Sequence, residues 1–158
     1  MRKDIDRIKI HIQTVWDKYI DIDDSIASYK INGETWSLKE IIGHLIDSAA
    51  NNYQRFIRLQ ESSELVFPGY NYDWVNIVKY NSYSFIQILD LWKQFNFLLC
   101  HIIENIDDSK LNNKWIMDDK SLSLVSLITD YVDHMEIHID QLQERYSEIS
   151  AKMTEGNQ

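Results

Sequence analysis

The chain contains little of the residue types that mark turns between strands or crosslink secreted proteins. Its 158 residues include four glycines, one proline and one cysteine. So few glycines and prolines leave little turn chemistry between short strands, which predicts a helix-rich chain. The single cysteine, Cys100, excludes a disulfide within the chain and is typical of a reducing compartment. Because Cys100 ends an apolar run that begins at Phe95, we expect it to pack in the core.

Long apolar runs and basic clusters are also missing. No stretch approaches the roughly 20 apolar residues needed to cross a bilayer, and the charged segment from Met1 to Arg7 lacks the apolar part of a signal peptide. The net charge of -9 opposes binding to a phosphate backbone, and Arg55 with Arg58 is the nearest approach to a basic patch. We therefore expect a cytoplasmic protein that binds neither membranes nor nucleic acid.

What is present is the composition of one globular domain. Hydrophobic residues make up 44% of the chain, and five tryptophans and nine tyrosines supply large core side chains. Apolar residues recur at helical spacing over four segments, which predicts an all-α four-helix bundle. The helices are expected at about residues 5–22, 38–61, 81–105 and 122–150. We expect a single domain over residues 1–150 and a frayed polar tail over 151–158.

A long connection separates the second and third predicted helices. Residues 62–80 hold the only proline and several aromatic residues. A connection of this length is uncommon in a small domain unless it is functional or crosses over the bundle. As a crossover it would return the chain so that helices two and three run parallel. Its aromatics Tyr70, Tyr72 and Trp74 are expected near the mouth of a pocket, although ordinary loop packing would also account for them.

Two histidines stand four residues apart in the last predicted helix, His134 and His138. This spacing places both imidazoles on one helix face, about one turn apart, so the pair can chelate one divalent ion. The same spacing also occurs by chance on surface and core faces of helices. A catalytic Zn²⁺ usually takes three protein ligands, so the pair needs a third ligand from elsewhere.

His44 is the strongest candidate for the third ligand. It follows the expected helix cap at Ser37 by seven residues and reaches the level of His138 if the second and fourth helices run antiparallel. His101 would lie near the opposite end of the bundle. His11 remains possible but has no polar companions on its helix face.

Polar residues continue along one face of the second helix from His44. Asp47, Ser48, Asn51 and Arg55 share that face, which is either the wet side of the helix or the wall of a cavity. Arg55 could bind a substrate carboxylate, or form an ordinary salt bridge. Tyr131 precedes His134 by three residues and could donate a hydroxyl group. We therefore name Asp47, Arg55 and Tyr131 as candidate catalytic residues.

Carboxylates near the histidines could orient the imidazole rings by accepting hydrogen bonds from the N–H groups that do not face the metal. Asp47, Asp130 and Asp133 are the candidates for this role. Each is equally well explained as a solvated carboxylate on a helix face.

The helix that runs from Trp36 through His44 to Asp47, and the segment from Asp133 to Leu142 with its two histidines, resemble the DinB-like (YfiT-type) metal-binding proteins. The resemblance covers nearly the whole chain through the order of its helices. It implies an up-down-down-up four-helix bundle with a long crossover between helices two and three, and frequent homodimers. It also implies a three-histidine site for Zn²⁺ or Ni²⁺, which carries over to His44, His134 and His138.

The function implied by the resemblance is that of a metal-dependent enzyme acting on a small molecule. Relatives include transferases that use a low-molecular-weight thiol such as bacillithiol or mycothiol, and others are regarded as metal-dependent hydrolases. Many relatives carry Arg-Gly after the last histidine, where this chain has Ile139 and Asp140. That difference leaves the metal ligands intact and concerns the part of the site that would bind the substrate. The alternative is a helical bundle that binds a metal or ligand without catalysis.

Overall fold

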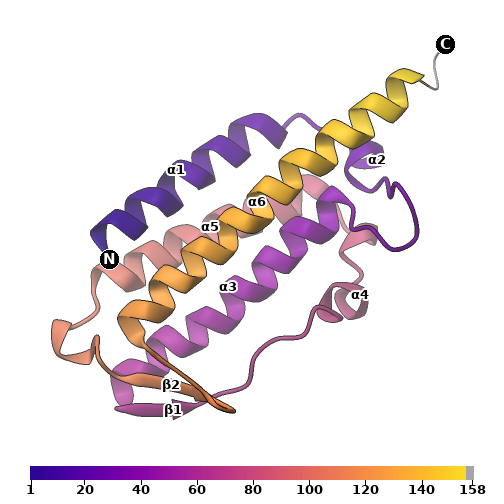
Figure 1. Cartoon of the computed structure of the whole chain (residues 1–158). Coiled ribbons are helices and arrows are strands. Elements are labelled where there is room, and N and C mark those ends of the chain that lie inside the picture. Colours follow the sequence, from indigo (N-terminus) through magenta and orange to yellow (C-terminus); the bar gives the residue numbers. More distant parts are fainter. Residues whose placement is uncertain (156–158) are drawn as a thin grey trace.

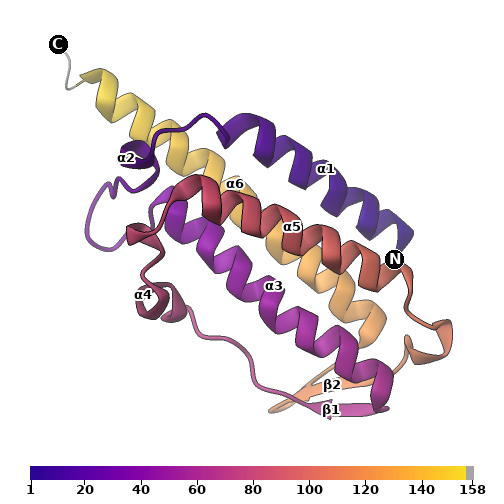
Figure 2. The same cartoon turned by 180° about the vertical axis from the view of Figure 1, so that it is seen from behind.

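The computed structural model describes residues 1–155, and four long helices dominate it (Figure 1). Helix α3 packs against α5 and α6, and α1 packs against the same two helices. Figures 1 and 2 show that α1 and α6 run in one direction while α3 and α5 run in the other, which confirms the up-down-down-up order. The four long helices are α1 (Arg2–Tyr19), α3 (Leu38–Glu61), α5 (Phe85–Glu104) and α6 (Leu124–Glu155).

Short helices occupy the connections between the long ones. The segment between α3 and α5 crosses from one end of the bundle to the other, as predicted, because these two helices run parallel. The short helices are α2 (Asp24–Ala27), α4 (Trp74–Val78), η1 (Tyr80–Ser82) and η2 (Asp108–Lys110). Among residues 1–155, no helix is both long and apolar enough to cross a membrane.

A small sheet closes the end of the bundle where α3 ends and α6 begins (Figure 1). Strand β2 pairs in parallel with β1 and antiparallel with β3, and Trp115 stands opposite Leu65 and Leu122. The strands are β1 (Glu64–Val66), β2 (Lys114–Met117) and β3 (Lys120–Ser123). The sequence analysis missed these strands because each is only three or four residues long. Their one turn signal is Asp118, which adopts a positive φ of 52° between β2 and β3.

The start of α3 follows its sequence signal closely. The Ser37 hydroxyl accepts a hydrogen bond from the Glu40 amide, and the Glu40 carboxylate accepts one from the Ser37 amide. This capping box fixes the first residue of the helix, and with it the position of His44 two turns later.

Helix α3 ends at Glu61 as predicted, but several other boundaries differ, and α1 spans Arg2–Tyr19 rather than residues 5–22. Helix α5 begins at Phe85 rather than near residue 81, because η1 occupies the preceding residues. Helix α6 begins after β3, so Ser123, and not Ser121, accepts the hydrogen bond from a first-turn amide, that of Ser126. Helix α6 also continues to Glu155, past the expected end near residue 150. The last part of the expected frayed tail, residues 156–158, lies outside the described residues.

Close contact between α3 and the crossover depends on Gly43. A Cβ atom at Gly43 would lie 2.2 Å from the ring of Tyr80. The Tyr80 hydroxyl in turn donates a hydrogen bond of 2.7 Å to Asp47 on α3. Since only glycine leaves room for this ring, the residue immediately before His44 fixes how closely the end of the crossover approaches α3.

Candidate metal centre

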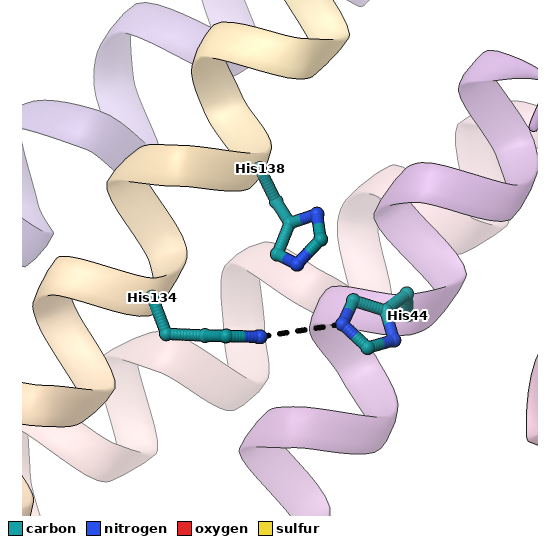
Figure 3. A group of neighbouring side chains, drawn as sticks. All are labelled: His44, His134 and His138. Carbon is teal, nitrogen blue, oxygen red and sulfur yellow. Dashed lines mark hydrogen bonds between the residues drawn. The ribbon is translucent and has the colours of Figure 1, made fainter. Parts of the chain in front are cut away.

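The structure brings His44, His134 and His138 together between α3 and α6 (Figure 3). One nitrogen from each ring lies within 4.8 Å of the others. The Nε2 atoms of His44 and His134 are 3.3 Å apart. Antiparallel packing of α3 and α6 places His44 at the level of the pair, as the distances along the two helices predict. The remaining histidines lie elsewhere: His11 meets Glu136 at 2.8 Å, and His101 is exposed near Asn105.

All three rings are held in the uncharged form. Burial lowers the pKa of His44 to about 3, and the nearby His138 and His134 lower it further. Burial, followed by the proximity of His138, lowers the pKa of His134 to about 4. Burial also lowers the pKa of His138, against a hydrogen bond to Gln141 that raises it. Neutral imidazoles are the form that binds a metal, so at neutral pH no proton has to be displaced.

Neighbouring side chains orient two of the rings. The Nδ1–H group of His138 donates to the Gln141 side-chain oxygen over 2.8 Å, which leaves the Nε2 lone pair facing inward. The Nδ1 atom of His134 lies 3.4 Å from the Ser48 hydroxyl. The sequence analysis offered this role to Asp47, Asp130 and Asp133, but Ser48 and Gln141 hold these positions. Asp133 instead accepts a hydrogen bond of 2.6 Å from Arg7 on α1.

The donor set fits a divalent metal ion. With Zn–N bonds of 2.0–2.1 Å, two nitrogens on one tetrahedral ion lie roughly 3.3 Å apart. That is the separation between the Nε2 atoms of His44 and His134. The His44 Nδ1 atom is buried without a hydrogen-bond partner within residues 1–155. Three neutral imidazoles also leave room for a further ligand on the ion.

Aromatic side chains of the crossover enclose the histidines. The Tyr70 hydroxyl lies within hydrogen-bond distance of His134 Nε2, at 3.1 Å, and the Tyr72 ring stacks on His44 with centroids 5.0 Å apart and planes inclined by 13°. Burial raises the pKa of Tyr70 to about 12, so its hydroxyl keeps its proton at neutral pH. Trp36 lies 5.0 Å from His44 on another side. Trp74, also expected here, packs beside Tyr70, with the ring centroids 6.2 Å apart.

The polar face of α3 is buried beneath the crossover and the sheet. Burial raises the pKa of Asp47, and the hydrogen bond from Tyr80 opposes that rise. Arg55 donates to the Pro68 carbonyl over 3.4 Å and stacks 4.0 Å from the ring centre of Trp115. The face is therefore the covered side of the helix rather than its wet side. Its exposed fractions are 0% for His44, 6% for Asp47, 1% for Ser48, 6% for Asn51 and 5% for Arg55.

Tyr131 lies in the core rather than in a cavity wall. Its hydroxyl donates to the Asn96 side-chain oxygen over 2.5 Å, and its ring packs edge-on against Phe56. Each of the three candidate catalytic residues thus has a partner of its own, Tyr80 for Asp47, Pro68 and Trp115 for Arg55, and Asn96 for Tyr131. A catalytic role for them stays a prediction.

A cleft of about 340 Å³ opens beside His138. Trp36 and Tyr72 form apolar walls, and Gln141 and Arg145 of α6 form a polar side. The sequence analysis missed Gln141 and Arg145. The signal was available, because they follow His138 by three and seven residues and so share its helix face.

Comparison with known proteins identifies the fold. No family model matches the chain, and no curated protein matches it. Among solved structures, YfiT from Bacillus subtilis, described as a probable metal-dependent hydrolase with an unusual four-helix bundle topology, superposes with a TM-score of 0.80. The match covers 97% of this chain and 87% of YfiT at 18% identity. The DinB-like protein YjoA from Bacillus subtilis matches with a TM-score of 0.65 and 12% identity, over 94% of this chain and 92% of its own. The chain therefore has the four-helix bundle fold of the DinB-like proteins.

Proposed function

We propose that this protein is a divalent-metal-dependent enzyme that acts on a small molecule, as a hydrolase or as a thiol-dependent transferase. The observation that carries the proposal is the convergence of three neutral imidazoles, one of which, that of His138, lines an open cleft. The description of YfiT as a probable metal-dependent hydrolase on the same fold supports it. We name both reaction types because hydrolysis and thiol transfer each need only an exposed Lewis acid.

His44, His134 and His138 would hold the ion, with Zn²⁺ or Ni²⁺ as the proposed metals. When bound, the ion supplies Lewis acidity that activates water or a low-molecular-weight thiol as a nucleophile.

The chain's own residues position and shield the reacting groups. Gln141 and Ser48 keep the ligand rings in place. Trp36 and Tyr72 cover His44 and reduce access of bulk water. The protonated Tyr70 hydroxyl, 3.1 Å from His134 Nε2, could donate a hydrogen bond to a polar group of the substrate. Its direct contact with His134 places it nearer to the chemistry than Asp47, Arg55 or Tyr131.

Metal analysis tests the proposal at its base. Protein purified without a histidine tag should contain about one divalent ion per chain, measured by plasma mass spectrometry. His134→Ala should lose most of that metal, because two imidazoles bind an ion far more weakly than three. His101→Ala is the matched control, since His101 is exposed on α5, and it should keep the metal. Equal metal content in wild type and His134→Ala would contradict the assignment.

Turnover separates the enzyme from the non-catalytic alternative. A panel of activated esters and of electrophiles with small thiols should reveal an activity in the metal-loaded wild type that His44→Ala lacks. Ligand binding without turnover across the panel would favour a binding bundle. The expected homodimer stays a prediction, which sedimentation velocity would test, and so does the cytoplasmic location.

A further inference from the structure

We propose that Arg145 is the anion-recognising residue of the cleft beside His138, and that the substrate is a small molecule carrying a carboxylate. The inference rests on the proposed function and deepens it by naming the substrate class. A ligand would reach the three imidazoles with its reacting group while its carboxylate binds the guanidinium. From the sequence, Arg55 on α3 was the candidate for binding a substrate carboxylate, with a salt bridge as the alternative.

Helix periodicity places Arg145 on the same face of α6 as His134 and His138. His134, His138, Gln141 and Arg145 are spaced by four, three and four residues, which places them along one face of the helix. Arg145 lies about 10 Å beyond His138 along the helix axis, at about 1.5 Å per residue. Long side chains on a helix lean toward its N-terminus, so the guanidinium reaches back toward His138. Both residues line the same cleft.

The Arg145 side chain is incompletely paired, although only 11% of it is exposed. Its Nε and Nη1 atoms are buried and have no hydrogen-bond partner in the part of the chain that the structure describes. Glu148 lies 3.1 Å from Nε, but without hydrogen-bond geometry, and its side chain is 56% exposed. A buried guanidinium with unmade hydrogen bonds is costly, and a carboxylate that enters the cleft lined by Arg145 could satisfy them once the side chain turns these N–H groups toward it.

The cleft between His138 and Arg145 has a shape and polarity that suit a small ligand. Trp36 and Tyr72 provide flat apolar walls, which suit the short carbon chain of a small ligand. Gln141 lies between His138 and Arg145 with its side-chain oxygen already hydrogen-bonded to His138. Glu34 also lines the cleft, but it is exposed, so water screens its charge more than that of Arg145.

Arg55 is the less suitable anion site. It is 5% exposed, stacks on Trp115 and donates to the Pro68 carbonyl and to Asn52, beneath the crossover. The Arg55 Nε atom is also buried without a partner among residues 1–155, but these contacts hold Arg55 between α3 and the sheet, and it does not line the cleft beside His138. A substrate would have to displace the crossover to reach it.

A matched pair of metal-binding probes tests the inference. Succinic monohydroxamate and butyrohydroxamate have the same metal-binding group and similar length, but only the first carries a carboxylate. Dissociation constants for both are measured by calorimetry on the Zn²⁺-loaded wild type, Arg145→Gln, Arg145→Lys and Arg55→Gln. Arg58→Gln is the control, because Arg58 is an exposed arginine paired with Gln54 on α3. Circular dichroism and zinc content are recorded for each protein.

The wild type should bind the carboxylate probe at least tenfold more tightly than its partner. Arg145→Gln should abolish that preference while binding butyrohydroxamate as the wild type does. Arg145→Lys should keep part of the preference for the carboxylate probe, since lysine retains the charge but cannot donate two parallel hydrogen bonds to a carboxylate. Arg58→Gln should keep all of it.

Two results would overturn the inference. One is equal binding of both probes by the zinc-loaded wild type; the other is a preference that survives Arg145→Gln, whether or not Arg55→Gln removes it. Neither result touches the proposed metal site, because zinc content reports on that site separately. A wild type that retains no zinc would instead contradict the proposed function.

Discussion

At the scale of single residues, Tyr70 and a metal ion would compete for the same lone pair. The Tyr70 hydroxyl lies 3.1 Å from His134 Nε2, within hydrogen-bond distance, and that nitrogen is the one that faces His44. Removing the hydroxyl with Tyr70→Phe should therefore tighten Zn²⁺ binding severalfold, since a lost hydrogen bond of this kind is worth about 0.5–1.5 kcal/mol. Competition with a zinc-sensitive dye measures the dissociation constant.

Tyr72→Phe is the control for this prediction. The ring of Tyr72 stacks on His44, and its phenylalanine counterpart keeps the stack. Its zinc affinity should equal that of the wild type. Weaker zinc binding by Tyr70→Phe would show that the hydroxyl supports the ion rather than competing with it.

The lowered pKa values of the histidines predict how the metal-free protein responds to acid. The pKa of His134 is about 4 in the folded chain and about 6.5 in an unfolded one. The unfolded chain therefore binds the extra proton first, so this stability is complete above about pH 6.5 and is lost as the pH falls toward 4. By about pH 5 the loss should reach roughly 2 kcal/mol for this residue.

Urea unfolding of chelated protein at several pH values measures this effect. His134→Gln is the reference, because it lacks the titrating ring but keeps every other carboxylate and histidine. Between about pH 7 and 5 the wild type should lose more free energy of unfolding than the variant. Parallel losses would mean that His134 is not held uncharged.

At the scale of secondary-structure elements, Gly43 shows a tertiary contact opposing helix propensity. In the interior of a helix, Gly→Ala usually adds about 0.5–1 kcal/mol. Here the new Cβ would lie 2.2 Å from the Tyr80 ring, whose hydroxyl is fixed by Asp47. Gly43→Ala should therefore lower the free energy of unfolding, by about 1–3 kcal/mol, as overpacking does. Chemical denaturation gives the sign directly.

Gly33→Ala provides the comparison for Gly43→Ala. A Cβ atom at Gly33 meets nothing within 4 Å. That substitution should change stability by less than about 0.5 kcal/mol. If Gly43→Ala proved stabilising, the close packing of η1 on α3 would have to be weaker than the structure indicates.

At the scale of the whole molecule, we expect the core to be independent of any ion. Apolar residues from all four long helices are fully buried, among them Ile8, Leu45, Trp92 and Leu142. Treatment with a chelator should therefore leave the far-ultraviolet circular dichroism unchanged at 25 °C. The melting temperature should fall, because an ion that binds only the folded chain stabilises it by mass action. Loss of most helical signal on chelation would make the metal a structural one.

Local signals in the sequence determined the helices and part of the site. The capping box at Ser37 and Glu40 fixes the start of α3 within a few residues, so it could be predicted from the sequence alone. The spacing of His134 and His138 fixes their shared face in the same way. His44 could be predicted as the third ligand in addition to this pair. In two antiparallel helices with known ends, its distance from the start of its helix places it at the height of His138.

Only the tertiary structure decided which side chains meet across elements. The parallel pair of β1 and β2 depends on segments about 50 residues apart, Leu65 with Trp115, which no local pattern contains. The same is true of Tyr70 on His134 and of Arg55 on Trp115. Sequence periodicity gives the face on which a residue lies, but the packing of other elements decides whether that face is covered. This is why Arg55 ends beneath the crossover while Arg145 lines the open cleft.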